Sequence, residues 1–190
     1  MPIEGRVAIT GRPGVGKTTL VERVLAQMTC HVGGFLTKEV RKCGHRVGFA
    51  LVDLATGDEH MFARVGKGAE TVGRYAVDAR IVEEVGVAAA HRAIRESDLI
   101  VIDEIAPMEL RAPGLVAAVE AALASNKALL ITTHAHATHA VADRVRQELH
   151  LVRVRLNNRD ALVDVVVALL RGETPPEITP RSAPSPVSNP

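Results

Sequence analysis

The stretch GRPGVGKTTL, residues 11–20, places three glycines and a proline directly before one lysine and two threonines. Gly11, Gly16, Lys17 and Thr18 occupy every fixed position of the pattern G-x-x-x-x-G-K-[ST]. Glycines let successive backbone N–H groups turn toward an anion, which a Cβ would obstruct. The pattern therefore predicts a loop that cradles the phosphates of a nucleotide.

The residues on either side of this loop support that interpretation. The apolar run 7–10 predicts a buried strand, and apolar residues recur at helical spacing over 17–28. The positive end of that helix would face the same phosphates. Lys17 can neutralise charge on the β- and γ-phosphates, and the Thr18 hydroxyl can hold Mg²⁺. The candidate nucleotide-binding residues here are Gly11, Arg12, Pro13, Gly14, Val15, Gly16, Lys17, Thr18 and Thr19.

The rest of the chain alternates between strand and helix patterns. Strands at 35–40, 46–54 and 61–65 predict an antiparallel hairpin or meander inserted at about 33–65, followed by a glycine-rich loop. Helices are expected at 78–96, 113–125, 137–149 and 160–170, and strands at 99–102, 128–133 and 151–156. This alternation predicts an α/β fold with a mostly parallel sheet flanked by helices.

Composition limits the class of protein. Aromatic residues make up 2 % of the chain, and the formal net charge is +1, from 23 basic and 22 acidic residues. Nucleic-acid binding needs concentrated basic charge or aromatic side chains that stack on bases. We therefore expect no stable nucleic-acid binding.

Cysteine content and hydropathy indicate a cytoplasmic protein. Cys30 and Cys43 are too few for a disulfide framework or a four-thiolate zinc site. No apolar run is long enough to cross a bilayer, and residues 1–6 lack the apolar core of a signal peptide. Residues 1–172 are predicted to form one domain. Residues 173–190 contain six prolines and are predicted to be a disordered tail.

A second motif, LIVIDEI at residues 99–105, predicts two acidic groups beside the phosphate loop. A buried parallel strand that ends in Asp103 places this carboxylate at the edge of the sheet, where it can hold Mg²⁺ together with Thr18. Glu104 can orient and deprotonate a water aimed at the γ-phosphate. The alternative is a solvated acidic loop or a helix cap, but two independent motifs agree on one site.

The known classes of phosphate-loop protein are not equally compatible with these motifs. A GTPase needs D-x-x-G at the strand end and a guanine-reading N-K-x-D. The strand end here reads DEIA, and the pair Asn126-Lys127 is followed by Ala128 and Leu129. A nucleoside or nucleotide kinase stays possible, because the loop alone does not separate transfer to water from transfer to a hydroxyl. A third possibility is a nucleotide-dependent binding module or switch.

Further candidates follow from their positions along the chain. Arg46 and Arg111 are preferred over Arg41 and Arg74 as the arginine that stabilises charge in the transition state, although each of the four is equally typical of a surface arginine. Asn158 and Arg159 follow the last strand, where a base could be contacted, although Asn158 is equally suited to cap the final helix. Thr132, Thr133 and His134 end a strand and could sense the γ-phosphate or form a turn. The cluster His134, His136 and His139 is more typical of loop histidines than of a metal site.

Five motifs, in this order and spacing, resemble those of the small nucleoside-triphosphatase family of thermophilic prokaryotes and animals, the cancer-related nucleoside-triphosphatase family. They read GRPGVGKTTL, GGFLTKEVR, GHRVGF, VGRYAV and VIDEIAPMEL, and the resemblance extends to about residue 170. It implies a RecA-like P-loop NTPase core with Mg²⁺ as cofactor. It also implies slow hydrolysis of ATP, GTP and other nucleoside triphosphates with broad base tolerance. Ala106 stands where glycine is common in the family.

Overall fold

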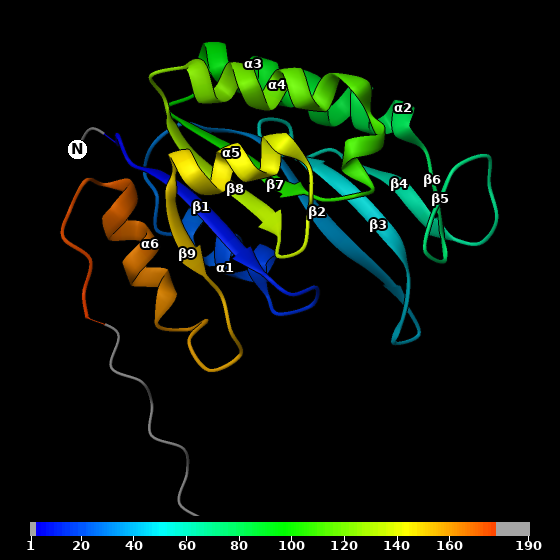
Figure 1. Ribbon diagram of the computed structural model, residues 1–190, viewed down its shortest axis with the longest axis horizontal. Coiled ribbons are helices and arrows are strands. Elements are labelled where there is room, and N and C mark those ends of the chain that lie inside the picture. Colours follow the sequence, from blue (N-terminus) through cyan, green and yellow to red (C-terminus); the bar gives the residue numbers. More distant parts are fainter. Residues whose placement is uncertain (1–2, 178–190) are drawn as a thin grey trace, which may run out of the picture.

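The computed structural model describes residues 3–177, whose strands form one nine-stranded sheet (Figure 1). The strand order across the sheet is β5-β6-β4-β3-β2-β7-β8-β1-β9. The strands are β1 (Arg6–Gly11), β2 (Val32–Lys42), β3 (His45–Asp53), β4 (Glu59–Val65), β5 (Thr71–Val72), β6 (Tyr75–Val77), β7 (Leu99–Ile105), β8 (Ala128–His134) and β9 (His150–Arg153).

One half of the sheet is parallel. β2 pairs with β7, β7 with β8, β8 with β1, and β1 with β9, all in parallel. Because parallel strands end on the same side, the carboxyl ends of β1, β7 and β8 meet at one edge (Figure 1). This half confirms the predicted α/β fold and positions the candidate site.

The other half of the sheet is antiparallel. The predicted hairpin is present as β2, β3 and β4, and β2 also pairs with β7 on its other side. The hairpin strands therefore continue the central sheet and do not form a separate layer.

The segment after β4 differs from the expected glycine-rich loop. It contains the short antiparallel strands β5 and β6, and β6 pairs with β4. The alternation in β6 that buries Tyr75 and Val77 covers only three residues, which is too short to separate a strand from a loop by sequence pattern.

Helices cover both faces of the sheet (Figure 1). They are α1 (Lys17–Leu25), α2 (Ala79–Ile81), the π-helical η1 (Val82–Val87), α3 (Ala88–Glu96), the 3₁₀ turn η2 (Glu109–Arg111), α4 (Pro113–Ala124), α5 (Ala140–Glu148) and α6 (Leu162–Leu170). α3, α4 and α5 lie on one face and α1 and α6 on the other. The predicted helix over 78–96 is continuous through α2, η1 and α3, and it begins after Asp78, whose carboxylate accepts a hydrogen bond from the Arg80 backbone N–H at 3.1 Å.

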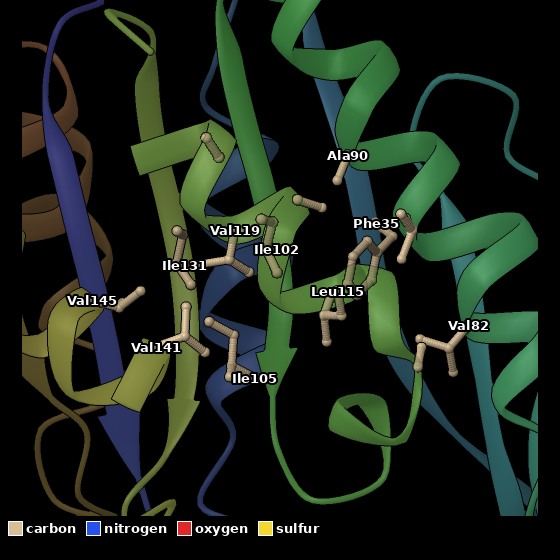
Figure 2. Close-up of a cluster of buried hydrophobic side chains, with 14 of the residues drawn as sticks. Phe35, Val82, Ala90, Ile102, Ile105, Leu115, Val119, Ile131, Val141 and Val145 are labelled. Atoms are coloured by element: carbon tan, nitrogen blue, oxygen red, sulfur yellow. The ribbon is translucent and has the colours of Figure 1, made fainter. Parts of the chain in front are cut away.

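Two hydrophobic layers fix the sheet between these helices. Figure 2 shows Phe35, Ile102 and Ile131 of the sheet packed against Leu115 and Val119 of α4, with Val141 and Val145 of α5 beside them. On the opposite face, Val7 and Ile9 of β1 contact the apolar sides of α1 and α6. Successive residues of the central strands are buried on both faces, which explains the uninterrupted apolar run at 99–102.

The described residues do not include most of the C-terminal segment. The predicted tail over 173–190 lies mostly outside the described residues, which end at 177. Within residues 3–177, no helix combines the length and the apolar character that a membrane span requires.

Candidate active site

The phosphate-loop motif lies between a strand and a helix, as predicted. β1 ends at Gly11 and α1 begins at Lys17. Gly16 occupies the N-cap position with φ of 98°, in the left-handed region that favours glycine. No side chain caps α1, so its first N–H groups remain available to an anion.

Lys17 and Glu104 come together at this loop. Lys17 is buried, with 5 % of its side chain exposed, and its Nζ lies 3.0 Å from Glu104 Oε2. The same ammonium donates a hydrogen bond to the Gly11 carbonyl at 3.4 Å. A buried charge is stable only with a partner, so Glu104 holds Lys17 at the mouth of the loop. Two residues 87 positions apart in sequence therefore share one site, as their motifs predict.

Asp103 lies next to this pair and is completely buried. Its Oδ2 accepts a hydrogen bond from the Thr18 hydroxyl at 2.7 Å, and its Oδ1 accepts one from the Thr132 hydroxyl. Burial and the Glu104 carboxylate raise the pKa of Asp103 to about 6, while the two hydroxyl donors and Lys17 oppose this shift. The pairing of β7 with β8 shifts between Ile102 and Ile105, and the Asp103–Glu104 peptide bond in this interval is cis.

Thr18 and Asp103 together form a donor set that suits Mg²⁺. Both offer hard oxygen atoms, already in direct contact with each other. Mg²⁺ in nucleotide enzymes is usually bound by one or two protein oxygens, with substrate phosphates and waters completing its shell. Across residues 3–177, no group of three or more His, Cys, Asp or Glu side chains is arranged to enclose a metal ion. Thr18 and Asp103 therefore offer the number and kind of protein oxygens that Mg²⁺ in a nucleotide enzyme uses.

Glu109 and Thr37 are components of this region that the sequence analysis did not identify. Glu109 lies on η2 and is 3 % exposed, and its Oε1 accepts a hydrogen bond from the Thr37 hydroxyl at 3.3 Å. Burial, followed by repulsion from Glu104 and Asp103, raises the pKa of Glu109 to about 8. Both residues stand inside quoted motifs, but a glutamate in a short turn looks like a surface residue until its burial is known.

The three residues at the end of β8, Thr132, Thr133 and His134, differ in their contacts. Thr132 bonds Asp103, as described above. The Thr133 hydroxyl is buried and has no hydrogen-bond partner among the described residues. Burial, followed by the charges of Lys17 and His136, lowers the pKa of His134. This strand end therefore borders the Lys17 site.

Arg159 also lies at the phosphate loop. A Cβ placed on Gly16 would come 2.6 Å from Arg159 Cδ, so the arginine side chain lies directly against this glycine. Asn158 has a different role in this structure. Its Oδ1 accepts from the Arg155 N–H at 2.7 Å and its Nδ2 donates to the Arg153 carbonyl at 3.0 Å. It does not cap the final helix, since α6 has Ala161 at its N-cap.

The two preferred arginines do not join the site in this structure. Arg46 forms an ion pair with Glu39 on β2 and lies over the Phe49 ring at 5.4 Å. Arg111 ends η2 with its side chain exposed. Sequence position suggested proximity for both, whereas strand pairing directs Arg46 toward Glu39 and the 3₁₀ turn directs Arg111 to the surface.

Arg41 and the histidine cluster have local roles. Arg41 pairs with Glu39 at 2.5 Å. His134 Nδ1 accepts from the His136 backbone N–H at 3.1 Å, and His139 Nδ1 accepts from the Val141 N–H at 3.2 Å, where it caps α5. Because α5 begins at Ala140, His136 and His139 do not share a helical face.

Comparisons with known proteins identify relatives of this chain. Residues 6–167 match the protein family described as NTPase. The nucleoside-triphosphatase THEP1 of Archaeoglobus fulgidus is 43 % identical over 171 residues, covering 88 % of this chain and 99 % of the relative. The protein of the same name from Thermofilum pendens is 45 % identical over 161 residues, covering 81 % and 88 %.

Two solved structures share the fold. The crystal structure of THEP1 from Aquifex aeolicus aligns with a TM-score of 0.79 at 30 % identity, over 87 % of this chain and 98 % of that one. The solution structure of a human cancer-related nucleoside triphosphatase aligns with a TM-score of 0.73 at 30 % identity, over 88 % and 98 %. With the phosphate loop, the acidic strand end and these relatives in agreement, the chain belongs to the THEP1 nucleoside-triphosphatase family of P-loop proteins.

Proposed function

We propose that this chain is a Mg²⁺-dependent nucleoside-triphosphatase, which transfers the γ-phosphoryl group to water and releases a nucleoside diphosphate and phosphate. The observation that carries the proposal is the convergence of Lys17 Nζ and Glu104 Oε2, 3.0 Å apart, beside the Thr18–Asp103 pair. Membership in a family whose relatives are named nucleoside-triphosphatases supports the same reaction.

Substrate binding begins at the loop. Backbone N–H groups of residues 14–18 and of the first turn of α1 would bind the phosphate oxygens. Lys17 would leave Glu104 for the β- and γ-phosphates, since a triphosphate offers it more negative charge than one carboxylate does. Binding of the phosphates would then break the ion pair between Lys17 and Glu104 in the same step.

Glu104 would act as the general base. Its side chain is partly exposed, at 19 %, so water can reach it, whereas Asp103 beside it is completely buried. Once Lys17 turns to the phosphates, a Glu104 oxygen is free to accept a hydrogen bond and then a proton from the attacking water. The two adjacent acids therefore divide into a buried acceptor of hydroxyl groups and an accessible base.

Thr18 and Asp103 would hold Mg²⁺, with the hydroxyl and the carboxylate that now bond each other. The bound ion would neutralise charge on the β- and γ-phosphate oxygens.

Arg159 supports broad base tolerance. Its side chain lies against Gly16, beside the entrance of the phosphate loop. A guanidinium plane can stack on any base, because every base has a π-face. ATP, GTP and the pyrimidine triphosphates would then bind with similar affinity.

We also propose a cytoplasmic location, which the free cysteines Cys30 and Cys43 support.

Phosphate release from ATP, GTP, CTP and UTP tests the proposal, with Mg²⁺ and with a chelator in its place. We expect release from all four nucleotides with Mg²⁺ alone, loss with the chelator, and loss in Lys17→Ala. If phosphoryl transfer requires an added nucleoside, the chain is a kinase. If it requires an added protein, the chain is a switch. Either result would overturn hydrolysis as the primary reaction.

A further inference from the structure

Glu109 is a buried acid that the proposed reaction does not yet use. It is 3 % exposed and lies on η2, directly after the strand that carries Asp103 and Glu104. Its Oε1 accepts a hydrogen bond from Thr37, and its Oε2 is buried with no partner among residues 3–177. A buried polar atom without a partner is unfavourable, so this oxygen needs a role.

The charges around Glu109 indicate its protonation state. Glu104 and Asp103 are the charged groups that act on it, and both are acidic. An ionised Glu109 would be buried and repelled by both carboxylates, and only a backbone hydrogen bond of Glu109 itself and the Thr37 hydroxyl favour it among residues 3–177. The neutral acid avoids this repulsion, and burial raises its pKa to about 8.

A neutral Glu109 carries an O–H that needs an acceptor, and the Glu104 carboxylate is the neighbouring acid with fewer hydrogen-bond donors. Both Asp103 oxygens already accept hydroxyl groups, from Thr18 and Thr132. Among residues 3–177, the ion pair of Glu104 is the one from its Oε2 to Lys17. Its carboxylate therefore retains acceptor positions, and it loses its cationic partner when Lys17 turns to a triphosphate.

This inference rests on the proposed hydrolysis. We propose that Glu109 is a positioning residue, whose neutral side chain donates a hydrogen bond from Oε2 to the Glu104 carboxylate as Lys17 moves to the phosphates. One Glu104 oxygen would be held by Glu109, and the other would face the attacking water. Only hydrogen bonds are exchanged in this step. Glu109 does not touch the substrate, and it acts through Glu104.

The hydrogen bond from Thr37 would hold Glu109 in place. Thr37 donates to Oε1 from β2, and the Thr37 carbonyl lies 3.4 Å from the Thr18 hydroxyl. With the proposed bond to Glu104, Glu109 would connect β2, beside the phosphate loop, to the base at the end of β7. A side chain fixed at one oxygen can present the other in a defined direction.

Two substitutions separate a hydrogen-bond donor from a side chain that only fills space. In Glu109→Gln the amide donates in place of the O–H, and in Glu109→Met the volume is kept without a donor. We expect kcat of the Met variant to fall about 10- to 100-fold at nearly constant KM, the effect of a misplaced catalytic group. We expect the Gln variant to recover at least about tenfold of that loss, again in kcat. Glu120→Met, at an exposed glutamate of α4 that pairs with Arg144, is the control and should retain wild-type kcat.

Infrared spectroscopy tests the hydrogen bond without turnover. The C=O stretch of a protonated carboxylic acid should be present in the wild-type protein and absent in Glu109→Gln. It should move to lower frequency when Mg²⁺ and the β,γ-imido analogue of ATP are added. If this shift occurs in a protein that releases no phosphate, the hydrolysis proposal fails and the contact to Glu104 stands.

Three results would overturn the inference. Equal losses of kcat in the Gln and Met variants would show that Glu109 acts as a carboxylate. Wild-type kcat in both would show that it only fills the core. A missing carboxylic acid band would show that it is ionised. Thermal unfolding of each variant, with nucleotide and without, shows whether that variant has kept its fold. If a variant has lost its fold, the infrared result on the wild-type protein decides whether the inference stands.

Discussion

The buried carboxylate of Asp103 is held by two threonine hydroxyl groups. Thr18 lies on α1 and Thr132 on β8, so the acid joins the phosphate loop to the adjacent strand. Full burial raises the pKa of Asp103 to about 6, while the two hydroxyl donors favour its ionised form. Removing one donor would leave a charged oxygen without a partner.

We expect Thr132→Val to lower the free energy of unfolding by about 1–3 kcal/mol at neutral pH, because Asp103 Oδ1 loses its donor. Thr133→Val is the matched control. It alters an adjacent threonine with the same burial, whose hydroxyl has no partner among the described residues. The control should leave stability unchanged or raise it. Urea denaturation measures both, and equal losses would contradict the role given to Thr132.

The sequence identifies the main residues of the site because each has a fixed chemical task. Lys17, Thr18, Asp103 and Glu104 stand in motifs whose spacing follows from phosphate and metal chemistry. The environment of Glu109 is not encoded locally, since its burial depends on the packing of η2 against β2 and β7. The position of Arg46 along the chain suggests that it reaches the site, but its ion pair with Glu39 on the neighbouring strand cannot be read from spacing.

The pairing of β2 with β7 brings the hairpin strands to the site. Gly34 of β2 lies opposite Val101 of β7, with φ of 103°. A Cβ on Gly34 would come 1.9 Å from the Val101 carbonyl oxygen, so no other residue allows this close approach. The contact fixes Thr37, three residues further along β2, relative to Asp103.

Gly34→Ala is therefore expected to destabilise the fold by more than the conformational strain of a left-handed residue, about 1–2 kcal/mol. Gly57→Ala is the control, because Gly57 has φ of 79° and open space around its Cα. The stability of Gly57→Ala should fall only by the free energy of this conformational strain. Denaturation of the two variants gives the comparison, and a loss in Gly34→Ala no larger than in the control would show that the strands can separate at little cost.

The sequence predicted the helices and strands better than it predicted which strands pair. The central strands and most helices follow from apolar runs and helical spacing, because burial on both faces leaves a strong pattern. β5 and β6 were missed since each has two or three residues within a glycine-rich segment. That β2 joins the parallel half is a non-local property, decided by its contact with β7 rather than by its own sequence.

The whole molecule is arranged so that the site forms where its central strands end. Helices on both faces bury the sheet. The chain has few aromatic side chains, so Val, Leu, Ile and Ala form nearly all of the two layers, one of which is shown in Figure 2. With the faces covered, the carboxyl edge of β1, β7 and β8 is where backbone N–H groups and acids can meet a ligand. Lys17, Asp103 and Glu104 converge there from segments distant in sequence.

The most direct test of this account compares phosphate release by the wild-type protein and by Glu104→Gln, with the thermal shift caused by Mg²⁺ and ATP measured on the same samples. We expect the Gln variant to keep the thermal shift, because the phosphate loop is intact. Its kcat should fall about 10²- to 10⁴-fold, because an amide cannot accept the proton from water. Wild-type kcat in Glu104→Gln would contradict the account, since the catalytic base would then be another group.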